Sequence, residues 1–478
     1  MKKLYFLFTI ILCAAMPIMA QHTDDNRNKA VFQSTDGNNE VNTDDIQLIR
    51  FEGGKVTVVQ PWGETVFDHT LQNLTFFRPQ SGTLRLTVDA TIDTNDDTNR
   101  AFSIDGSGRL VSTWAEGDKV YVYSDEVSTS HIGVLTPATT GSSSARLVGD
   151  VSGLSDKQTL YLETQPRTYS FASQTGSLSN MFYAKAEATV SINGGNATIS
   201  DATFTRPMAV VKFTLKDKAN GTTPLNATSL TINYGSESIS ITSIPSSIYD
   251  TNGNGVLFVA IPSISGEIVS LTATVGSDTY TYNKTGVTFA NGKYYSIGVK
   301  MTRQANTGDI GKIIATNGCI YDHGATLPTG VSEAGMIAYV GNESDCAHGL
   351  AIALADETGD KTFGTAGTTA SQKNTDMPVV GGTWRIPSKA DWENMFLSCR
   401  KDGDASSAAT DMTIAGFKEK ISSVGTGFTN GNTYWTSTDS PSVYCIYFSG
   451  TETKPNQVTF QGAQYKMSEY KARAVLAF

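Results

Sequence analysis

The sequence is poor in the residues and motifs that usually mark an enzyme or a nucleic-acid-binding protein. Its 478 residues include only five histidines, and the motifs G-x-S-x-G, H-E-x-x-H and G-x-x-x-x-G-K-[ST] are missing, so no hydrolase, zinc protease or P-loop site is indicated. Charged residues make up only 17%, the formal net charge is -10, and no basic run reaches five residues, which argues against a nucleic-acid partner. We therefore expect no enzyme, no cofactor and no nucleic-acid ligand.

Long apolar runs are missing beyond the N-terminus. A basic start followed by an apolar run over residues 4–12 and small residues up to Ala20 predicts a secretory signal peptide, cleaved between Ala20 and Gln21. No later stretch is apolar over 18 residues, so we expect no transmembrane segment in the mature chain. Cys13 leaves lipoprotein processing as an alternative. The expectation is export through the inner membrane to the cell surface, or secretion.

Cysteine is rare, with five in the chain. Apart from Cys13, all lie in the last third, at Cys319, Cys346, Cys399 and Cys445. Their spacing matches no metal-binding motif. In an exported domain the four could form two disulfides in any of three pairings or stay free as buried thiols, and both alternatives remain open.

Metal ligands are equally scarce. His323, His348 and Asp345 are a set in the last third that could share an ion, but such side chains are far more often solvated or locally hydrogen-bonded turn residues. We expect no metal site.

Glycine, serine and threonine are abundant, which favours short strands joined by turns, and the length favours two to four domains. Residues 21–45 are rich in Asp, Asn and Thr and predict a disordered tether. Residues 46–78 predict a β-hairpin element of three strands, with a turn at Gly53-Gly54 and the third strand over 65–77. So small a sheet needs another surface to pack on.

From Leu84 to Ile92 apolar and polar residues alternate, which predicts a strand with one buried face. The segment W-A-E-G-D at 114–118 predicts a core tryptophan and a turn into a further strand. This W-x-x-G-D motif resembles that of the fimbrillin family, the subunits of Bacteroidetes fimbriae. The likeness continues in segments at 204–215, 230–234, 256–262 and 289–299. The resemblance implies a two-lobed β-sandwich.

The fimbrillin resemblance also implies polymerisation with other fimbrial subunits by strand exchange, in which a groove in one subunit accepts a strand from a neighbour. In that family a protease cuts after an arginine in the loop behind the first strand, and Arg100–Ala101 stands in that position here. A last strand that belongs to a folded domain leaves no free tail to donate. That points to a tip or accessory subunit.

The last domain is organised around W-R-I-P-S at residues 384–388. Ser388 is a good helix N-cap and Asp391 adds a negative charge near the helix start. From Trp392 onward apolar residues recur at i, i+3, i+4 and i+7, which predicts one buried helix face. A second amphipathic helix is predicted to end near Gly425.

Together with Y-W-T-S-T at 434–438 and K-A-R-A-V-L-A-F at 471–478, this segment resembles the C-type-lectin-like domains at the ends of Bacteroidetes secreted and surface proteins. The resemblance implies an α+β domain with two helices among short strands. The calcium tripeptides of lectins with this fold are altered, since Lys454 replaces a carboxylate and Thr436-Ser437 replace an Asn-Asp pair. Calcium-dependent sugar binding is therefore not expected.

The candidate binding surface consists of polar and aromatic residues near turns after the Y-W-T-S-T strand, types that suit glycan or protein contacts. These residues are Asp439, Tyr444, Lys454, Asn456, Gln461, Gln464 and Tyr465. A loop surface of this kind, unlike a catalytic set, carries no signature of its ligand.

The fold class is mostly β: a two-lobed fimbrillin-like β-sandwich followed by an α+β C-type-lectin-like domain. The expected order is signal peptide 1–20, tether 21–45, β-hairpin element 46–78, N-terminal lobe 79–205, C-terminal lobe 206–302, linker 303–309 and C-type-lectin-like domain 310–478. The expected function is that of a fimbrial (pilus) subunit in cell adhesion, at the fimbrium or outer membrane. The alternatives are a glycan- or protein-binding protein outside fimbriae, or an inert surface-layer component.

Overall fold

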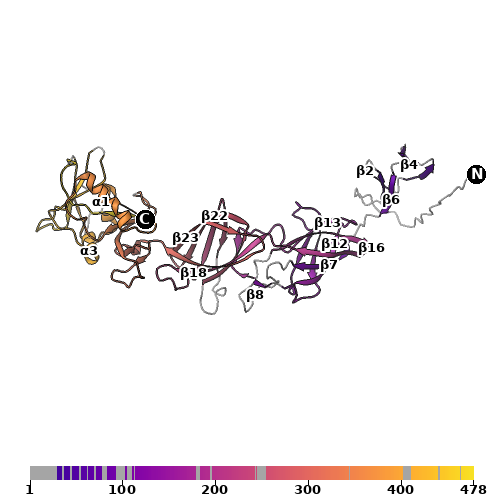
Figure 1. Cartoon of the computed structure of the whole chain (residues 1–478), viewed down its shortest axis with the longest axis horizontal. Coiled ribbons are helices and arrows are strands. Elements are labelled where there is room, and N and C mark those ends of the chain that lie inside the picture. The colour runs from indigo at the N-terminus through magenta and orange to yellow at the C-terminus, as the bar shows by residue number, and fades with distance from the viewer. Residues whose placement is uncertain are drawn as a thin grey trace, which may run out of the picture.

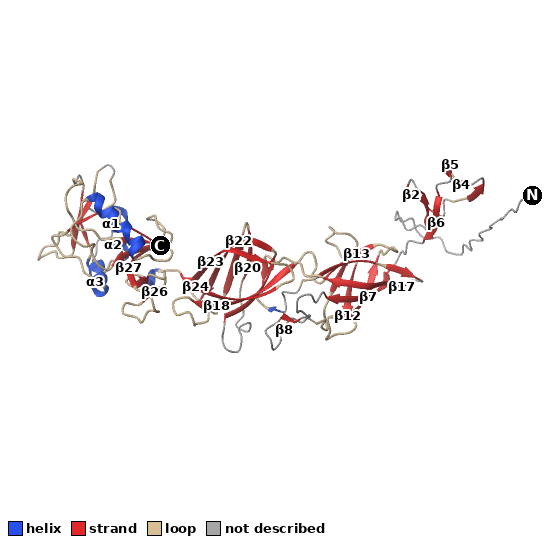
Figure 2. Ribbon diagram, viewed as in Figure 1, coloured by secondary structure: helices blue, strands red, loops and turns tan. Residues whose placement is uncertain are grey.

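The computed structural model describes residues 29–34, 37–42, 46–52, 55–61, 63–68, 71–77, 83–92, 103–104, 110–111, 113–178, 183–193, 196–242, 244, 255–343, 345–401, 411–439, 442–462 and 465–478. Most of their regular secondary structure is β-strand, with three α-helices in the last third (Figure 2). The sheets follow one another along the long axis in chain order, and the helical domain lies at one end (Figure 1). None of the described helices has the length and apolar character needed to cross a bilayer.

Two three-stranded sheets come first in the chain. β1 (Lys29–Ser34) pairs with β2 (Gly37–Asn42) and β6 (Leu71–Phe77). β4 (Lys55–Gln60) pairs with β3 (Leu48–Glu52) and β5 (Gly63–Asp68).

Two predictions for this region are wrong. The segment predicted as a disordered tether, 21–45, contains β1 and β2. The short apolar run at 30–32 lies in β1, which pairs with β2 on one side and with β6, a strand much later in the chain, on the other. The single strand predicted over 65–77 is two strands, because its halves join different sheets.

The first large sheet has eight strands in the order β15-β13-β10-β11-β12-β7-β17-β16. The strands are β7 (Thr83–Ile92), β10 (Val120–Tyr123), β11 (Gly133–Pro137), β12 (Ser144–Ser152), β13 (Thr159–Glu163), β15 (Lys185–Thr189), β16 (Ser191–Asn193) and β17 (Asn196–Phe204). The backbones of Lys185 and Thr205 exchange two N–H···O bonds of 2.9 Å. Strand β15 therefore meets the end of β17, and the sheet closes on itself. A two-stranded sheet, β8 (Ser103–Ile104) with β9 (Leu110–Val111), lies between β7 and β10 in the chain.

The core of this sheet confirms the sequence pattern. Leu86, Val88 and Ile92 are fully buried on one face of β7. Trp114 is also fully buried, and its Nε1 donates to the backbone oxygen of Ser143 at 3.1 Å. The predicted core tryptophan therefore anchors the loop before β10.

The second large sheet has eight strands in the order β14-β20-β19-β22-β23-β24-β18-β21. The strands are β14 (Ser173–Gln174), β18 (Met208–Asp217), β19 (Ser229–Tyr234), β20 (Glu237–Ile241), β21 (Gly255–Pro262), β22 (Ile264–Val275), β23 (Asp278–Phe289) and β24 (Tyr294–Arg303). Its apolar residues form a core separate from that of the first sheet.

Strand β14 comes from the chain between β13 and β15 of the first sheet but belongs to the second sheet. It pairs with β20, and the Gln174 side chain donates to the oxygen and accepts from the N–H of Ala260 in β21, at 2.8 and 2.9 Å. The boundary between the two lobes, predicted at 205/206, therefore assigns this segment to the first lobe, although its strand belongs to the second sheet. The segment joins the two open edges of the second sheet.

A short, tightly bonded junction leads from β24 to the last domain. The 3₁₀ turn η4 (Thr307–Asp309) is capped by Asn306, and the buried Asp309 carboxylate pairs with Arg303 at 2.7 Å and with Lys312 at 3.1 Å. The adjacent surfaces also touch, since the Tyr321 hydroxyl donates to the Ala219 oxygen at 2.8 Å. The segment predicted as a polar linker is thus fixed by internal hydrogen bonds.

The last domain combines a six-stranded sheet, in the order β26-β25-β27-β28-β34-β29, with a four-stranded sheet, in the order β30-β33-β32-β31. The strands are β25 (Ile313–Ala315), β26 (Ile320–Tyr321), β27 (Glu333–Val340), β28 (Gly349–Ala353), β29 (Thr383–Arg385), β30 (Asp411–Thr413), β31 (Thr433–Trp435), β32 (Cys445–Tyr447), β33 (Gln457–Gln461) and β34 (Val475–Ala477). The first and last strands of the domain thus belong to one sheet.

Three helices complete the domain: α1 (Phe363–Asp376), α2 (Lys389–Ser398) and α3 (Ala415–Val424). α2 begins as predicted, with Ser388 and Asp391 in a reciprocal capping box. Trp392 of α2 is fully buried at the centre of an aromatic cluster that includes Phe396, Phe417 and Phe448. α1 was not predicted.

All four described cysteines are free thiols. Cys319, Cys399 and Cys445 are buried, and Cys346 is partly exposed. Of the two alternatives left open by the sequence, the structure shows free thiols.

Candidate binding sites

The candidate residues of the last domain fall into two groups. Strand β33 separates them: Asn456 precedes its first residue and Gln461 is its last, so its ends are about 13 Å apart. Lys454 is exposed in the turn before β33, where its N–H bonds to Thr451. The sequence-predicted surface is therefore two patches.

The patch at the far end of β33 is built around Tyr444 and Gln461. Cys445, which follows Tyr444, lies opposite Gln461 in the β32–β33 ladder, and Lys389 of α2 lies over the Tyr444 ring at 5.4 Å. Nearby in sequence, exposed Asp439 pairs with Lys466 at 2.7 Å, and Tyr465 is largely exposed. These residues form a polar, aromatic surface on loops held by strands.

Five predicted positions lie outside the described residues: Gln464, Ala20 and Gln21 of the signal cleavage site, and Arg100 and Ala101 of the possible maturation site. The two cleavage predictions stay predictions.

Two members of the candidate metal-ligand set have different partners. His323 bonds to Glu333 at 3.0 Å, whereas His348 contacts Gln304 at 3.4 Å. Across the described ranges, no three His, Cys, Asp or Glu side chains are close enough to hold an ion.

The motif Y-W-T-S-T serves the interior of the domain. Trp435 is buried, and its Nε1 donates to the Lys361 oxygen at 2.6 Å. The Tyr434 hydroxyl donates to Asp356 at 3.0 Å, and burial, followed by the nearby Asp356 charge, raises the pKa of Tyr434. The same Asp356 accepts from fully buried Arg473 at 2.6 Å. These motif residues hold strands of the last domain together.

A shallow groove of about 550 Å³ lies beside this motif. Small residues of α1, among them Gly364 and Gly367, line one side, and Ile386 and Trp435 line another. The groove is bounded mainly by glycine, hydroxyl and apolar groups, so it offers few fixed polar partners to a ligand.

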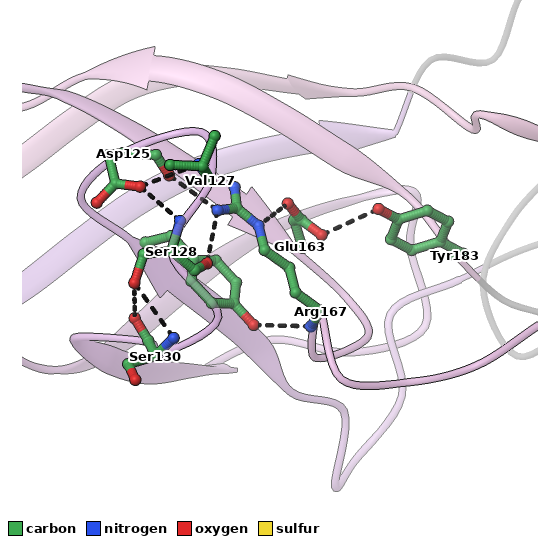
Figure 3. A network of polar contacts seen from close by, with 8 residues as sticks. Asp125, Val127, Ser128, Ser130, Glu163, Arg167 and Tyr183 are labelled. Carbon is green, nitrogen blue, oxygen red and sulfur yellow. Dashed lines mark hydrogen bonds and ion pairs between the residues drawn. The ribbon is translucent and has the colours of Figure 1, made fainter.

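A second polar site, which sequence analysis missed, lies on the first large sheet. The side chain of Glu163, at the end of β13, accepts from Arg167 Nε at 2.7 Å and from the Tyr183 hydroxyl at 2.9 Å (Figure 3). Arg167 Nη1 also donates to the backbone oxygens of Asp125 and Ser128 at 2.9 and 2.8 Å. The sequence around Glu163 and Arg167 gave no indication of this site, because the hydrogen-bond partners of the two side chains include groups from distant segments of the chain.

No protein family matches the sequence. No curated protein matches it either.

Solved structures with partial likeness include a proposed cell adhesion protein from Bacteroides ovatus, at 13% identity over 47% of this chain and 97% of that one, with a TM-score of 0.28. A proposed cell adhesion protein from Bacteroides fragilis has 15% identity over 46% and 97%, with a TM-score of 0.28. A shaft pilin from Lactobacillus rhamnosus has 10% identity over 46% and 98%, with a TM-score of 0.20. TM-scores below 0.5 do not establish a shared fold, so the function proposed next rests on the chain's own geometry.

Proposed function

We propose that the protein is a cell-surface adhesion protein of the fimbrial type, in which the sheets form a stalk and the last domain presents the adhesive surface. The observation that carries the proposal is the row of β-sheets in chain order with the α+β domain at its end (Figure 1). Such a row separates a terminal binding surface from the point of attachment. An enzyme would gain nothing from this spacing, and a role without catalysis is part of the proposal.

The junction supports this role because it couples the stalk to the last domain. Asp309 is almost fully buried and is held by Arg303, Lys312 and the Asn306 N–H. A second contact joins Lys218 Nζ to the Asn317 oxygen at 2.9 Å. A domain held in this way keeps its orientation on the stalk.

Assembly by strand exchange with other fimbrial subunits is the second part of the proposal. β7 lies between β12, to which it is antiparallel, and β17, to which it is parallel, and buries alternate side chains such as Leu86 and Val88. Removal of β7 would open a groove with two unpaired backbone edges and a row of apolar pockets. A strand from a neighbouring subunit would fill both.

Cleavage between Arg100 and Ala101 would release β7 together with all strands before it. N-terminal sequencing of the protein isolated from the cell surface tests this step. We expect a start at Ala101. A start at Gln21 alone would exclude maturation at this bond.

A tip or accessory position in the fimbria is the third part of the proposal. β34 is paired on both sides, with β28 and β29, so it has no free edge to donate to another subunit. In this proposal the subunit accepts a strand from a neighbour and carries a C-type-lectin-like domain. The ligand would be a glycan or protein on host or bacterial cells.

Immunogold electron microscopy of intact cells, with antibody against residues 310–478, tests the whole proposal. We expect gold at the ends of filaments that extend from the outer-membrane surface of the producing cell. Gold spread over the envelope with none on filaments would refute the fimbrial part and leave a surface-attached glycan- or protein-binding protein.

A further inference from the structure

A cavity of about 680 Å³ lies on the outer face of the first large sheet. In β13, Leu160 and Leu162 enter the core, so Tyr161 and Glu163 point to the opposite face. The volume lies within the range of small-molecule sites.

The neighbouring strand completes the floor of the cavity. In the β13–β15 ladder Glu187 stands opposite Tyr161, and Lys185 stands opposite Glu163. Directly opposite residues share one face of a sheet, so these four side chains line the cavity together.

Three aromatic rings form its wall. Tyr169 and Phe171 meet edge to face with ring centroids 4.8 Å apart, and Phe171 and Tyr183 lie 5.1 Å apart. Phe171 and Tyr183 also pack against Met208 and Val210 of the second sheet. The wall is thus positioned by both large sheets, at the kind of domain junction where ligand sites are frequent.

The polar network of Figure 3 fixes the charged floor. The Glu163 side chain is only 8% exposed and that of Arg167 13%, and the Arg167 guanidinium also lies 4.1 Å from the centroid of the Tyr123 ring. A buried ion pair contributes little net stability, because desolvation offsets the attraction. Its effect here is to hold Glu163 and Arg167 in one orientation before any ligand arrives.

We propose that this cavity binds a saccharide. The rings of Tyr169 and Phe171 offer π faces to the C–H groups of a sugar. Glu187 and Glu126 on the rim supply acceptors, and Lys185 supplies donors. Hydroxyl groups need both kinds of partner, whereas an ionic ligand would need one sign of charge to dominate.

The tyrosines of the cavity keep their protons. Burial raises the pKa of Tyr169, and burial followed by the Glu163 charge raises that of Tyr183. Both hydroxyls therefore remain hydrogen-bond donors at any physiological pH.

This inference goes beyond the proposed function, because the cavity lies on the first large sheet and the proposed adhesive surface on the last domain. The last domain can serve adhesion without the cavity. The cavity can bind a sugar in a protein that never joins a fimbria.

The test is titration of the full chain with a panel of neutral, N-acetylated and acidic oligosaccharides by ligand-observed NMR and calorimetry. We expect binding of at least one member, weakened about three- to tenfold by Tyr169→Ala, which removes one ring face. Glu187→Gln changes an exposed rim residue without touching the core, so weaker binding by this variant cannot be ascribed to misfolding. Ile268→Ala, at an exposed position of β22 in the second large sheet, is the matched control and should bind as the unaltered chain does.

Three results would overturn the proposal. One is that no saccharide of the panel binds the folded chain. Another is that binding survives Tyr169→Ala and Glu187→Gln unchanged, or is lost in Ile268→Ala. The third is that the cavity takes a lysine-rich peptide instead, with binding lost at about 1 M salt, where charges are screened beyond roughly 3 Å.

Discussion

Replacing Asp309 by asparagine should loosen the junction between the second large sheet and the last domain. The carboxylate is 2% exposed and accepts from Arg303 at 2.7 and 2.8 Å, from the Asn306 N–H at 2.9 Å and from Lys312 at 3.1 Å. Burial alone would raise the pKa of Asp309, but these donors outweigh it and lower the pKa. The charged form is therefore the one that the junction stabilises.

The expected loss can be worked out from these contacts. Removing one partner of a buried ion pair costs about 3–5 kcal/mol. Here Arg303 is 18% exposed and keeps Asp278 at 3.4 Å, and asparagine retains one acceptor oxygen, so solvent and the remaining partner reduce the cost to about 2–3 kcal/mol. That corresponds to a roughly 30- to 150-fold larger population of the open junction.

Hydrogen exchange measured by mass spectrometry reads this population directly. Peptides covering residues 303–312 should exchange roughly 30 to 150 times faster in Asp309→Asn, and peptides of the first large sheet should not change. Asp439→Asn is the matched control, since it breaks a 2.7 Å pair with Lys466 that is about half exposed on both sides. Equal exchange at 303–312 in the two variants would show that the Asp309 contacts do not hold the junction.

Three further predictions follow. Because the folded pKa of Asp309 is depressed, its stabilisation is present above the ordinary value of 3.8 and is lost as pH falls below it, so the exchange difference between the unaltered chain and Asp309→Asn should vanish in acid. Burial raises the pKa of Cys399 to about 12, so iodoacetamide at pH 8 should label partly exposed Cys346 and spare Cys399 until the chain unfolds, as mass spectrometry would show. Gly416→Ala should cost about 1–3 kcal/mol in urea unfolding, because a Cβ there would lie 2.2 Å from the Cys399 oxygen, whereas Gly367→Ala in α1 meets no atom within 4 Å and should stabilise by up to about 1 kcal/mol.

Features coded within a few residues were predictable from the sequence. The capping box at Ser388 and Asp391 needs only a spacing of three, and the buried face from Trp392 onward needs only the helical period. The alternation in β7 is equally local. Each of these confirmed predictions rests on one short segment and its own periodicity.

Features that depend on distant partners were missed or wrongly predicted. β1 and β2 lie in a polar segment whose pairing with β6 cannot be read from composition. α1 escaped prediction because its buried residues are only Ala366 and Ala370, within a run of glycine, serine and threonine that favours turns by propensity. Tertiary packing decided the outcome in each case.

The cavity on the first large sheet shows why a binding site of this kind leaves no sequence signal. Its aromatic wall at Tyr169 and Phe171 stands in what reads as an ordinary polar loop. The loop leads from the first sheet to the second, because Gln174, a few residues on, is held in the second sheet by two buried hydrogen bonds to Ala260. The shape of the cavity therefore depends on the docking of two sheets. A pairing between residues so far apart in the chain is set by the fold as a whole, and no local motif records it.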